Sequence, residues 1–239
     1  MKLGNYAHIS ICVHNLPESS AFYEKVGFRK LWGKSEPHPW ALFTDGRLNI
    51  HLYEFPFTSP ALHYFSKHMK DKVLELMRMG IRPEQQRSRD GNRVQHSFTD
   101  PNELCIMLMH YSDTDMPVPN GPSFSRLGTF GEFSISTENL RKSVEFWQQL
   151  DYFPVLTGDV PYPWATLSDG VITIGLHQSA TFTTPALTYY SLDAADRIAR
   201  LKSESFTFSH ELKNEAGRVE GAILTAPDGQ PFFLLTGTA

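Results

Sequence analysis

The chain has 239 residues, 41% of them hydrophobic and 20% charged, which is ordinary for a globular protein. Its net charge is −4 and its basic residues form no stripe along the sequence, so nucleic acid is not an expected partner. No apolar run approaches the roughly 18 residues of a membrane span. The first residues lack the apolar stretch of a signal peptide, and Cys12 and Cys105 show no metal-type pairing, so we expect a cytoplasmic protein.

The first elements follow the order strand, helix and three strands. Residues 8–13 alternate between polar and apolar side chains, which predicts a strand with one face on a core. Asn15 is a typical N-cap for a helix over residues 16–26, and Gly27 is placed to end it. Strands are expected at about 28–34, 39–44 and 47–54, the last two joined by an Asp45-Gly46 hairpin turn.

The same order recurs along the rest of the chain. A strand at 61–65 and a helix at 67–79 precede strands at 81–88, 93–99 and 104–110. Both units then return at about 129–177 and 185–236. The sequence therefore predicts four βαβββ units and an α+β fold.

A shared register shows that the two halves are a duplication. Trp40 recurs as Trp164 and Gly46 recurs as Gly170, a shift of 124 residues in both cases. Between the halves, residues 112–127 are rich in proline and read as a linker. We expect domains at 1–111 and 128–239, and the duplication lets each half serve as a control for the other.

The motifs resemble those of the vicinal oxygen chelate superfamily, which includes glyoxalase I, extradiol dioxygenases, fosfomycin-resistance thiol transferases and bleomycin-resistance proteins. The resemblance rests on three stretches: His8-Ile9-Ser10-Ile11-Cys12-Val13-His14-Asn15-Leu16 with Ser19, Phe22-Tyr23 and Gly27-Phe28; Asp100-Pro101-Asn102-Glu103; and Ala226-Pro227-Asp228-Gly229. Asn15 replaces the family's usual Asp. The resemblance implies two tandem glyoxalase-like domains with cup-shaped mixed sheets.

The resemblance also implies a metal site in each cup. In the first half the family's ligand positions hold His8, His51, His63 and Met107. Alternation supports this independently, because Ile9, Ile50 and Ile106 would face the helices and turn the neighbouring His8, His51 and Met107 into the cup. Three histidines suit a divalent metal (Zn, Fe, Ni or Mn) and also copper. Met107 stands where the family usually has Glu, and its thioether suits Cu(I).

The corresponding positions of the second half are Glu132, Gly175, Thr188 and Phe233, which do not make a metal set. If units were exchanged between halves, the sets would mix. One would be His8, His51, Thr188 and Phe233, and the other His63, Met107, Glu132 and Gly175. We prefer the unexchanged arrangement, because it concentrates three histidines.

Further residues share the cup-facing phase. Tyr53 and Ser97 are candidates for orienting a substrate, and the candidate pocket lining comprises Trp40, Phe65, Cys105 and Met107. A packing role shared by both halves explains the recurrence of Trp40 at least as simply as a pocket role does. Cys105 can likewise be a small buried thiol of the core.

Two main functions follow from these residues. The first is a metal-dependent lyase, isomerase, thiol transferase or oxygenase that acts on a small oxygen-bearing molecule. The second is a metal-free protein that binds or sequesters a small molecule, favoured by Met107, Phe233 and the 13% aromatic content. A pseudo-enzyme that works through partners is a third interpretation, and a homodimer is compatible with all three.

Overall fold

The computed structural model describes residues 1–36, 38–87, 94–110, 117–119 and 121–239, and it confirms the predicted α+β order of four βαβββ units. The first half contains β1 (Tyr6–Cys12), α1 (Leu16–Lys25), β2 (Arg29–Lys34), β3 (Trp40–Thr44), β4 (Asn49–Tyr53), β5 (Ala61–Ser66), α2 (Met69–Arg78), β6 (Glu84–Arg87), β7 (Val94–Thr99) and β8 (Cys105–His110). The second half contains β9 (Thr129–Ser136), α3 (Leu140–Gln149), β10 (Phe153–Gly158), β11 (Trp164–Ser168), β12 (Thr173–His177), β13 (Ala186–Ser191), α4 (Ala194–Ser203), β14 (Phe208–Lys213), β15 (Val219–Thr225) and β16 (Pro231–Thr236).

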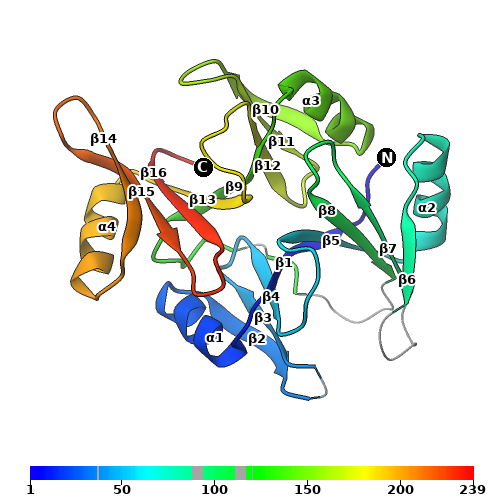
Figure 1. Ribbon diagram of the computed structural model, residues 1–239, viewed down its shortest axis with the longest axis horizontal. Helices are drawn as coiled ribbons and strands as arrows, with labels where there is room; N and C mark the ends of the chain where they lie inside the picture. The colour runs from blue at the N-terminus through cyan, green and yellow to red at the C-terminus, as the bar shows by residue number, and fades with distance from the viewer. Residues whose placement is uncertain (37, 88–93, 111–116, 120) are drawn as a thin grey trace.

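Each half forms its own eight-stranded mixed sheet (Figure 1). The first sheet has the order β2-β3-β4-β1-β5-β8-β7-β6, and the second repeats it as β10-β11-β12-β9-β13-β16-β15-β14. Within the first sheet β1 pairs in parallel with β4 and β5 pairs in parallel with β8, while β1 and β5 run antiparallel and join the two units. The units are thus not exchanged between the halves, and the four family positions of the first half lie in one sheet.

The helix ends follow the signals in the sequence. Asn15 caps α1 by accepting a hydrogen bond from the backbone N–H of Glu18 (3.1 Å), and Asn139 caps α3 through Lys142 (3.0 Å). After α1, Gly27 adopts a φ of 102°, which favours glycine and reverses the chain into β2. These repeated caps fix where α1 and α3 start, whereas α2 and α4 begin without a side-chain cap.

The two sheets share one hydrophobic core. The apolar residues of alternate strand positions, including Ile9, Ile50 and Leu187, belong to a single buried cluster that spans both halves. Trp147 of α3 is fully buried in it, and its indole N–H donates to a carboxylate oxygen of Asp100 in the first half (3.3 Å). The convex faces of the sheets therefore stabilise each other, and the concave faces point away from this core.

Two tyrosine–aspartate pairs connect the halves reciprocally. The hydroxyl of Tyr64 donates to Asp169 (2.7 Å), and the hydroxyl of Tyr189 donates to Asp45 (2.8 Å). Both aspartates also accept backbone N–H bonds within their own Asp-Gly turns. The repeated turn motif thus has a second role, because each turn carries a buried acceptor for the opposite half.

We expect Tyr64→Phe to lower the free energy of unfolding by about 1–3 kcal/mol, because Asp169 loses a donor while it stays buried. Urea denaturation measures this loss, and Tyr189→Phe should show a similar one. Tyr190→Phe, at the neighbouring half-buried position, is the control and should change stability by less than about 0.5 kcal/mol. Equal stability of all three variants would show that the reciprocal pairs do not hold the halves together.

Part of the predicted linker packs against the first half; its residues 112–116 and 120 lie outside the described ranges. The backbone N–H of Phe124 donates to Asp45 (2.9 Å), and that of Arg126 donates to Val26 (3.0 Å). A Cβ added to Gly46 would overlap the carbonyl oxygen of Pro122, so the glycine lets the linker pass close to the turn. Gly170, its counterpart in the repeat, has open space around it.

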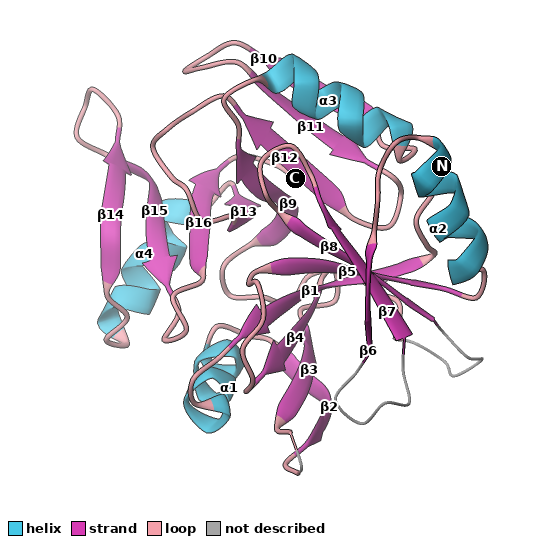
Figure 2. Cartoon of the chain, turned by 45° about the vertical axis from the view of Figure 1, so that its right-hand side comes forward, coloured by secondary structure: helices cyan, strands magenta, loops and turns pink. Residues whose placement is uncertain are grey.

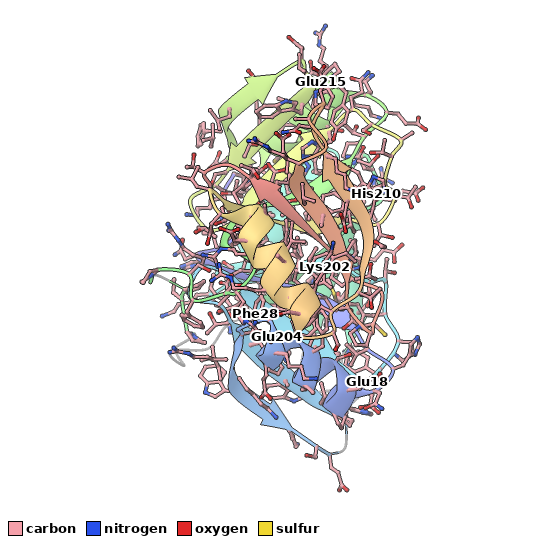
Figure 3. All side chains as sticks on the ribbon, turned by 90° about the vertical axis from the view of Figure 1, so that its left-hand side faces the viewer. Glu18, Phe28, Lys202, Glu204, His210 and Glu215 are labelled. Carbon is pink, nitrogen blue, oxygen red and sulfur yellow. The ribbon has the colours of Figure 1, made fainter. Side chains whose placement is uncertain are left out.

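Helix α1 of the first half lies beside α4 of the second (Figure 3). A cavity of about 320 Å³ lies between α1 and the residues that follow α4, and it is lined by Glu18, Phe22, Lys25, Glu204 and Phe206 among others. Arg126 forms an ion pair with Glu204 at the same place. Over the described ranges, none of the helices is both long and apolar enough to cross a bilayer.

Candidate metal centre

The strand register places one continuous row of side chains across the concave face of the first sheet. His8 on β1 lies opposite His63 on β5, and His63 lies beside Met107 on β8. Met107 in turn pairs with Ser97 on β7. His51 on β4 joins from the neighbouring row, where it pairs with Ser10 on β1. The face selected by the alternation is the concave one, since Ile9, Ile50 and Ile106 lie fully buried in the shared core.

The three imidazoles converge and are buried. The ring centre of His8 lies 4.9 Å from that of His51 and 5.2 Å from that of His63. Two imidazoles that bind one zinc ion at about 2.0–2.1 Å have ring centres roughly 5 Å apart, so the spacing is compatible with a shared ion. His8 is 1% exposed and His63 is 5% exposed.

All six ring nitrogens of these histidines are buried without a hydrogen-bond partner in the described part of the chain. Burial and the two neighbouring imidazoles hold the pKa of His8 well below its usual range, and burial does the same for the pKa of His51. Burial lowers the pKa of His63 to about 3. The rings are therefore neutral at physiological pH, which is the form of histidine that binds metal.

The imidazole rings are not oriented with their nitrogens toward one common point. His8 meets His51 edge to face at an interplanar angle of 71° and lies tilted by 40° to His63. Among the residues that the structure describes, no three His, Cys, Asp or Glu side chains stand in an arrangement ready to hold an ion. Side-chain rotation would have to accompany binding, although the strands already bring the rings together.

Aromatic side chains surround the cluster. Tyr53 stacks on His51 at 3.9 Å between ring centres, and Trp40 meets the same imidazole edge to face at 4.8 Å. Phe65 lies 5.1 Å from His8. The structure thus places these three predicted residues against the imidazoles.

A cavity of about 690 Å³ opens on the same concave face. Ser97, Cys105 and Met107 line it together with Phe55, Phe57, Phe98 and Arg82. The hydroxyl of Ser97 accepts a hydrogen bond from the side-chain amide of Gln86 (3.3 Å), and burial raises the pKa of the Cys105 thiol. Trp40, Tyr53 and Phe65 do not line the cavity. The predicted residues therefore form two groups, one around the imidazoles and one along the cavity wall. The groups are in contact where Met107 pairs with His63.

Sequence reasoning missed three contributors to this face. Phe57 lines the cavity, and its ring centre lies 6.3 Å from that of His63, so this loop residue stands between cavity and cluster. Ser10 is fully buried, and its hydroxyl has no hydrogen-bond partner among the described residues. Tyr6, whose pKa burial raises to about 12, contacts His8 edge to face. Ser10 and Tyr6 share the alternation phase of His8, which is a signal that could have identified them.

The second concave face holds a closed polar network in place of the imidazoles. Glu132, at the position equivalent to His8, is 2% exposed and accepts hydrogen bonds from Ser134 (2.8 Å), Thr166 (2.8 Å) and His177 (2.7 Å). A Cβ on Gly175, the counterpart of His51, would overlap this carboxylate. Glycine therefore provides the space that Glu132 fills, and the second face satisfies its own buried charge.

The stability contributed by Glu132 should depend on pH. Burial alone would raise the pKa of Glu132, but hydrogen bonds from His177, Thr166 and Ser134 and the charge of His177 outweigh it, so the pKa lies below its ordinary 4.5. The stabilisation should be complete above that value and be lost as pH falls through the lower pKa of the folded state.

We accordingly expect Glu132→Gln to be less stable than the wild type at pH 7 by about 1–3 kcal/mol, with a difference that shrinks at acidic pH. Urea denaturation between pH 3 and 7 measures it, with the exposed Glu138→Gln as the control. A difference that is independent of pH would contradict the assigned charge state of Glu132.

No family model and no curated protein matches the sequence. Solved structures do match its fold. Catechol 2,3-dioxygenase superposes with a TM-score of 0.64 at 13% identity, covering 100% of this chain and 89% of that one. Homoprotocatechuate 2,3-dioxygenase from Arthrobacter globiformis gives a TM-score of 0.65 at 13% identity, covering 99% and 80%. An extradiol ring-cleaving dioxygenase from B. fuscum gives 0.65 at 13%, covering 100% and 73%. The chain thus has the two-sheet fold found in extradiol dioxygenases.

Proposed function

We propose that this protein is a metal-dependent enzyme that acts on a small oxygen-bearing molecule, with His8, His51 and His63 as the metal ligands. The observation that carries the proposal is the set of six buried imidazole nitrogens without partners in the described part of the chain. Buried polar atoms are rarely left unsatisfied, and such exceptions call for a functional explanation. A bound ion would satisfy one nitrogen of each ring at once.

The residues present fit some metals better than others. Three neutral imidazoles with an open position are a known catalytic zinc set, and they also accommodate nickel or copper. Iron(II) oxygenases favour two histidines and one carboxylate, and the fourth position here is Met107. The extradiol fold therefore supports oxygenase chemistry, while the donor set argues against the usual iron site; lyase, isomerase and thiol-transferase reactions stay open.

A metal bound here would supply Lewis acidity that polarises the oxygens of a bidentate substrate. The protein's own residues would position that substrate. Ser97 presents a hydroxyl within the cavity, and Tyr53 lies against His51, so either side could orient a bound molecule. Phe57 and Met107 would keep water from the imidazoles on the cavity side.

A metal-free binding protein is the second candidate. It is favoured by the apolar contribution of Phe55, Phe57, Phe98 and Met107 to the cavity and by the unturned imidazole rings. A binding protein of this kind would hold its ligand equally well in the presence of a chelator. Our expectations of a homodimer and of domain limits at residues 111 and 128 stay predictions.

Elemental analysis of untagged protein, purified without chelators, tests the proposal. We expect about one equivalent of a transition metal per chain, removal of that metal by chelator dialysis, and its return on reconstitution. Protein that contains no metal and takes none up would leave the metal-free binding function instead.

A further inference from the structure

We propose that Met107 is a fourth ligand of this centre and that the centre is a copper site, which binds Cu(I) in the reduced protein. The inference rests on the proposed function, because both require the imidazoles of His8, His51 and His63. It goes further by assigning a role to the thioether and by naming the metal.

The position of Met107 follows from the strand pairing. β5 and β8 lie next to each other in the first sheet (Figure 2) and pair in parallel, and Met107 is the direct neighbour of His63 in that pairing. Neighbouring strands lie about 5 Å apart, so the two side chains stand next to each other on the concave face. Met107 is 7% exposed and also lines the cavity, which puts its side chain between the imidazoles and the cavity.

The charge of the surroundings favours a monovalent ion. The four donors are neutral, and the rings of Tyr53, Trp40 and Phe65 enclose the imidazoles. The cost of burying an ion grows with the square of its charge, so a doubly charged ion is penalised about fourfold more here than Cu(I).

No described carboxylate on this face is close enough to offset that cost. Glu84 is the acidic residue that shares the row of His63, Met107 and Ser97, but it belongs to β6. Three strand spacings separate β6 from β5, which is roughly 14 Å. Glu84 and Arg82 both line the cavity and both are exposed, so their charges lie at its solvent side.

The donor chemistry points the same way. Thioether sulfur is a soft ligand that selects Cu(I), and imidazole accepts copper as well. Mn(II) and Fe(II) instead favour oxygen donors or a set that includes a carboxylate. Soft donors combined with zero ligand charge therefore distinguish this centre from a carboxylate-containing iron site in the same fold.

Metal titrations of the full-length protein test the assignment. Cu(I) affinity is measured under anaerobic, reducing conditions by competition with a chromophoric Cu(I) chelator, and Zn(II) affinity by competition with a zinc indicator. We expect Met107→Leu to weaken Cu(I) binding by at least about tenfold and to leave Zn(II) binding nearly unchanged, because only copper gains from the sulfur. X-ray absorption at the copper edge should show a sulfur neighbour that this variant loses.

Two further variants make the test specific. Met109→Leu, the same substitution on the same strand and face one row away, should keep the wild-type Cu(I) affinity. Met107→Glu should weaken Cu(I) binding and strengthen Fe(II) or Mn(II) binding by at least about tenfold, because it adds the missing charge.

Equal Cu(I) affinities of the wild type and Met107→Leu would overturn the proposal, as would loss of Cu(I) binding in Cys105→Ser with retention in Met107→Leu. In either case, metal that still depends on His8 and His63 would leave the proposed function standing. Absence of any metal binding by the wild type would overturn both.

Discussion

The His8→Ala His63→Ala double variant is expected to lose metal binding by at least about 100-fold and to lose any metal-dependent activity with it. Two of the three converging imidazoles disappear, and His51 with Met107 would leave at most two protein donors for an ion. Elemental analysis after reconstitution measures the loss. Thermal unfolding of the metal-free proteins establishes that the variant folds.

The matched control is His14→Ala His68→Ala, because both residues are exposed histidines of the same half. It removes as many imidazoles while leaving the cluster intact, so it should bind metal like the wild type. If the control lost metal and the His8→Ala His63→Ala protein retained it, the ion would be bound by surface histidines and not by the concave face.

Trp147→Ala is expected to lower the free energy of unfolding by about 3–5 kcal/mol. The indole is fully buried in the core between the sheets, and its loss also removes the N–H that Asp100 accepts. Urea denaturation followed by circular dichroism measures the change. Trp32→Ala, on the edge strand β2 where the side chain is 45% exposed, is the control and should cost much less.

A loss below about 1 kcal/mol for Trp147→Ala would mean that the halves do not depend on a common core. Two separate unfolding transitions in the wild type would point the same way. A core shared by both sheets predicts one cooperative transition, because the buried cluster is continuous across the halves.

The fold could be predicted because its signals are local or repeated. Alternation in residues 8–13 identified β1 and its concave face, and Asn15 with Gly27 marked the ends of α1. The constant shift between Trp40 and Trp164 identified the duplication. The same alternation turned His8, His51, Met107 and Ser97 toward one face of their strands, while the position of His63 came from the resemblance to the superfamily.

Other features could not be predicted, because they depend on tertiary contacts. The partners of Tyr64 and Tyr189 lie in the opposite half, about 100 residues or more away. The approach of Phe57 to His63 depends on the path of a loop rather than on a repeating pattern. The ring of His51 stacks on Tyr53 and meets Trp40 edge to face, and the sequence does not specify these contacts.

The two halves carry different buried polar side chains on equivalent concave faces. On the second face Glu132 pairs with Nε2 of His177 and accepts from Ser134 and Thr166, so its buried charge is compensated within the chain, although Nδ1 of His177 has no partner among the described residues. On the first face the imidazoles of His8, His51 and His63 have no such partners among the described residues. The duplication thus supplies an internal control, because the second half holds a hydrogen-bonded carboxylate at the position of His8.

Anomalous X-ray diffraction from crystals of untagged protein, recorded on both sides of the absorption edge of the metal found by elemental analysis, tests the central claim most directly. We expect one anomalous peak per chain, within bonding distance of the imidazole nitrogens of His8, His51 and His63. A map without a peak at that position, from crystals whose protein contains the metal, would contradict the assignment of these residues as its ligands.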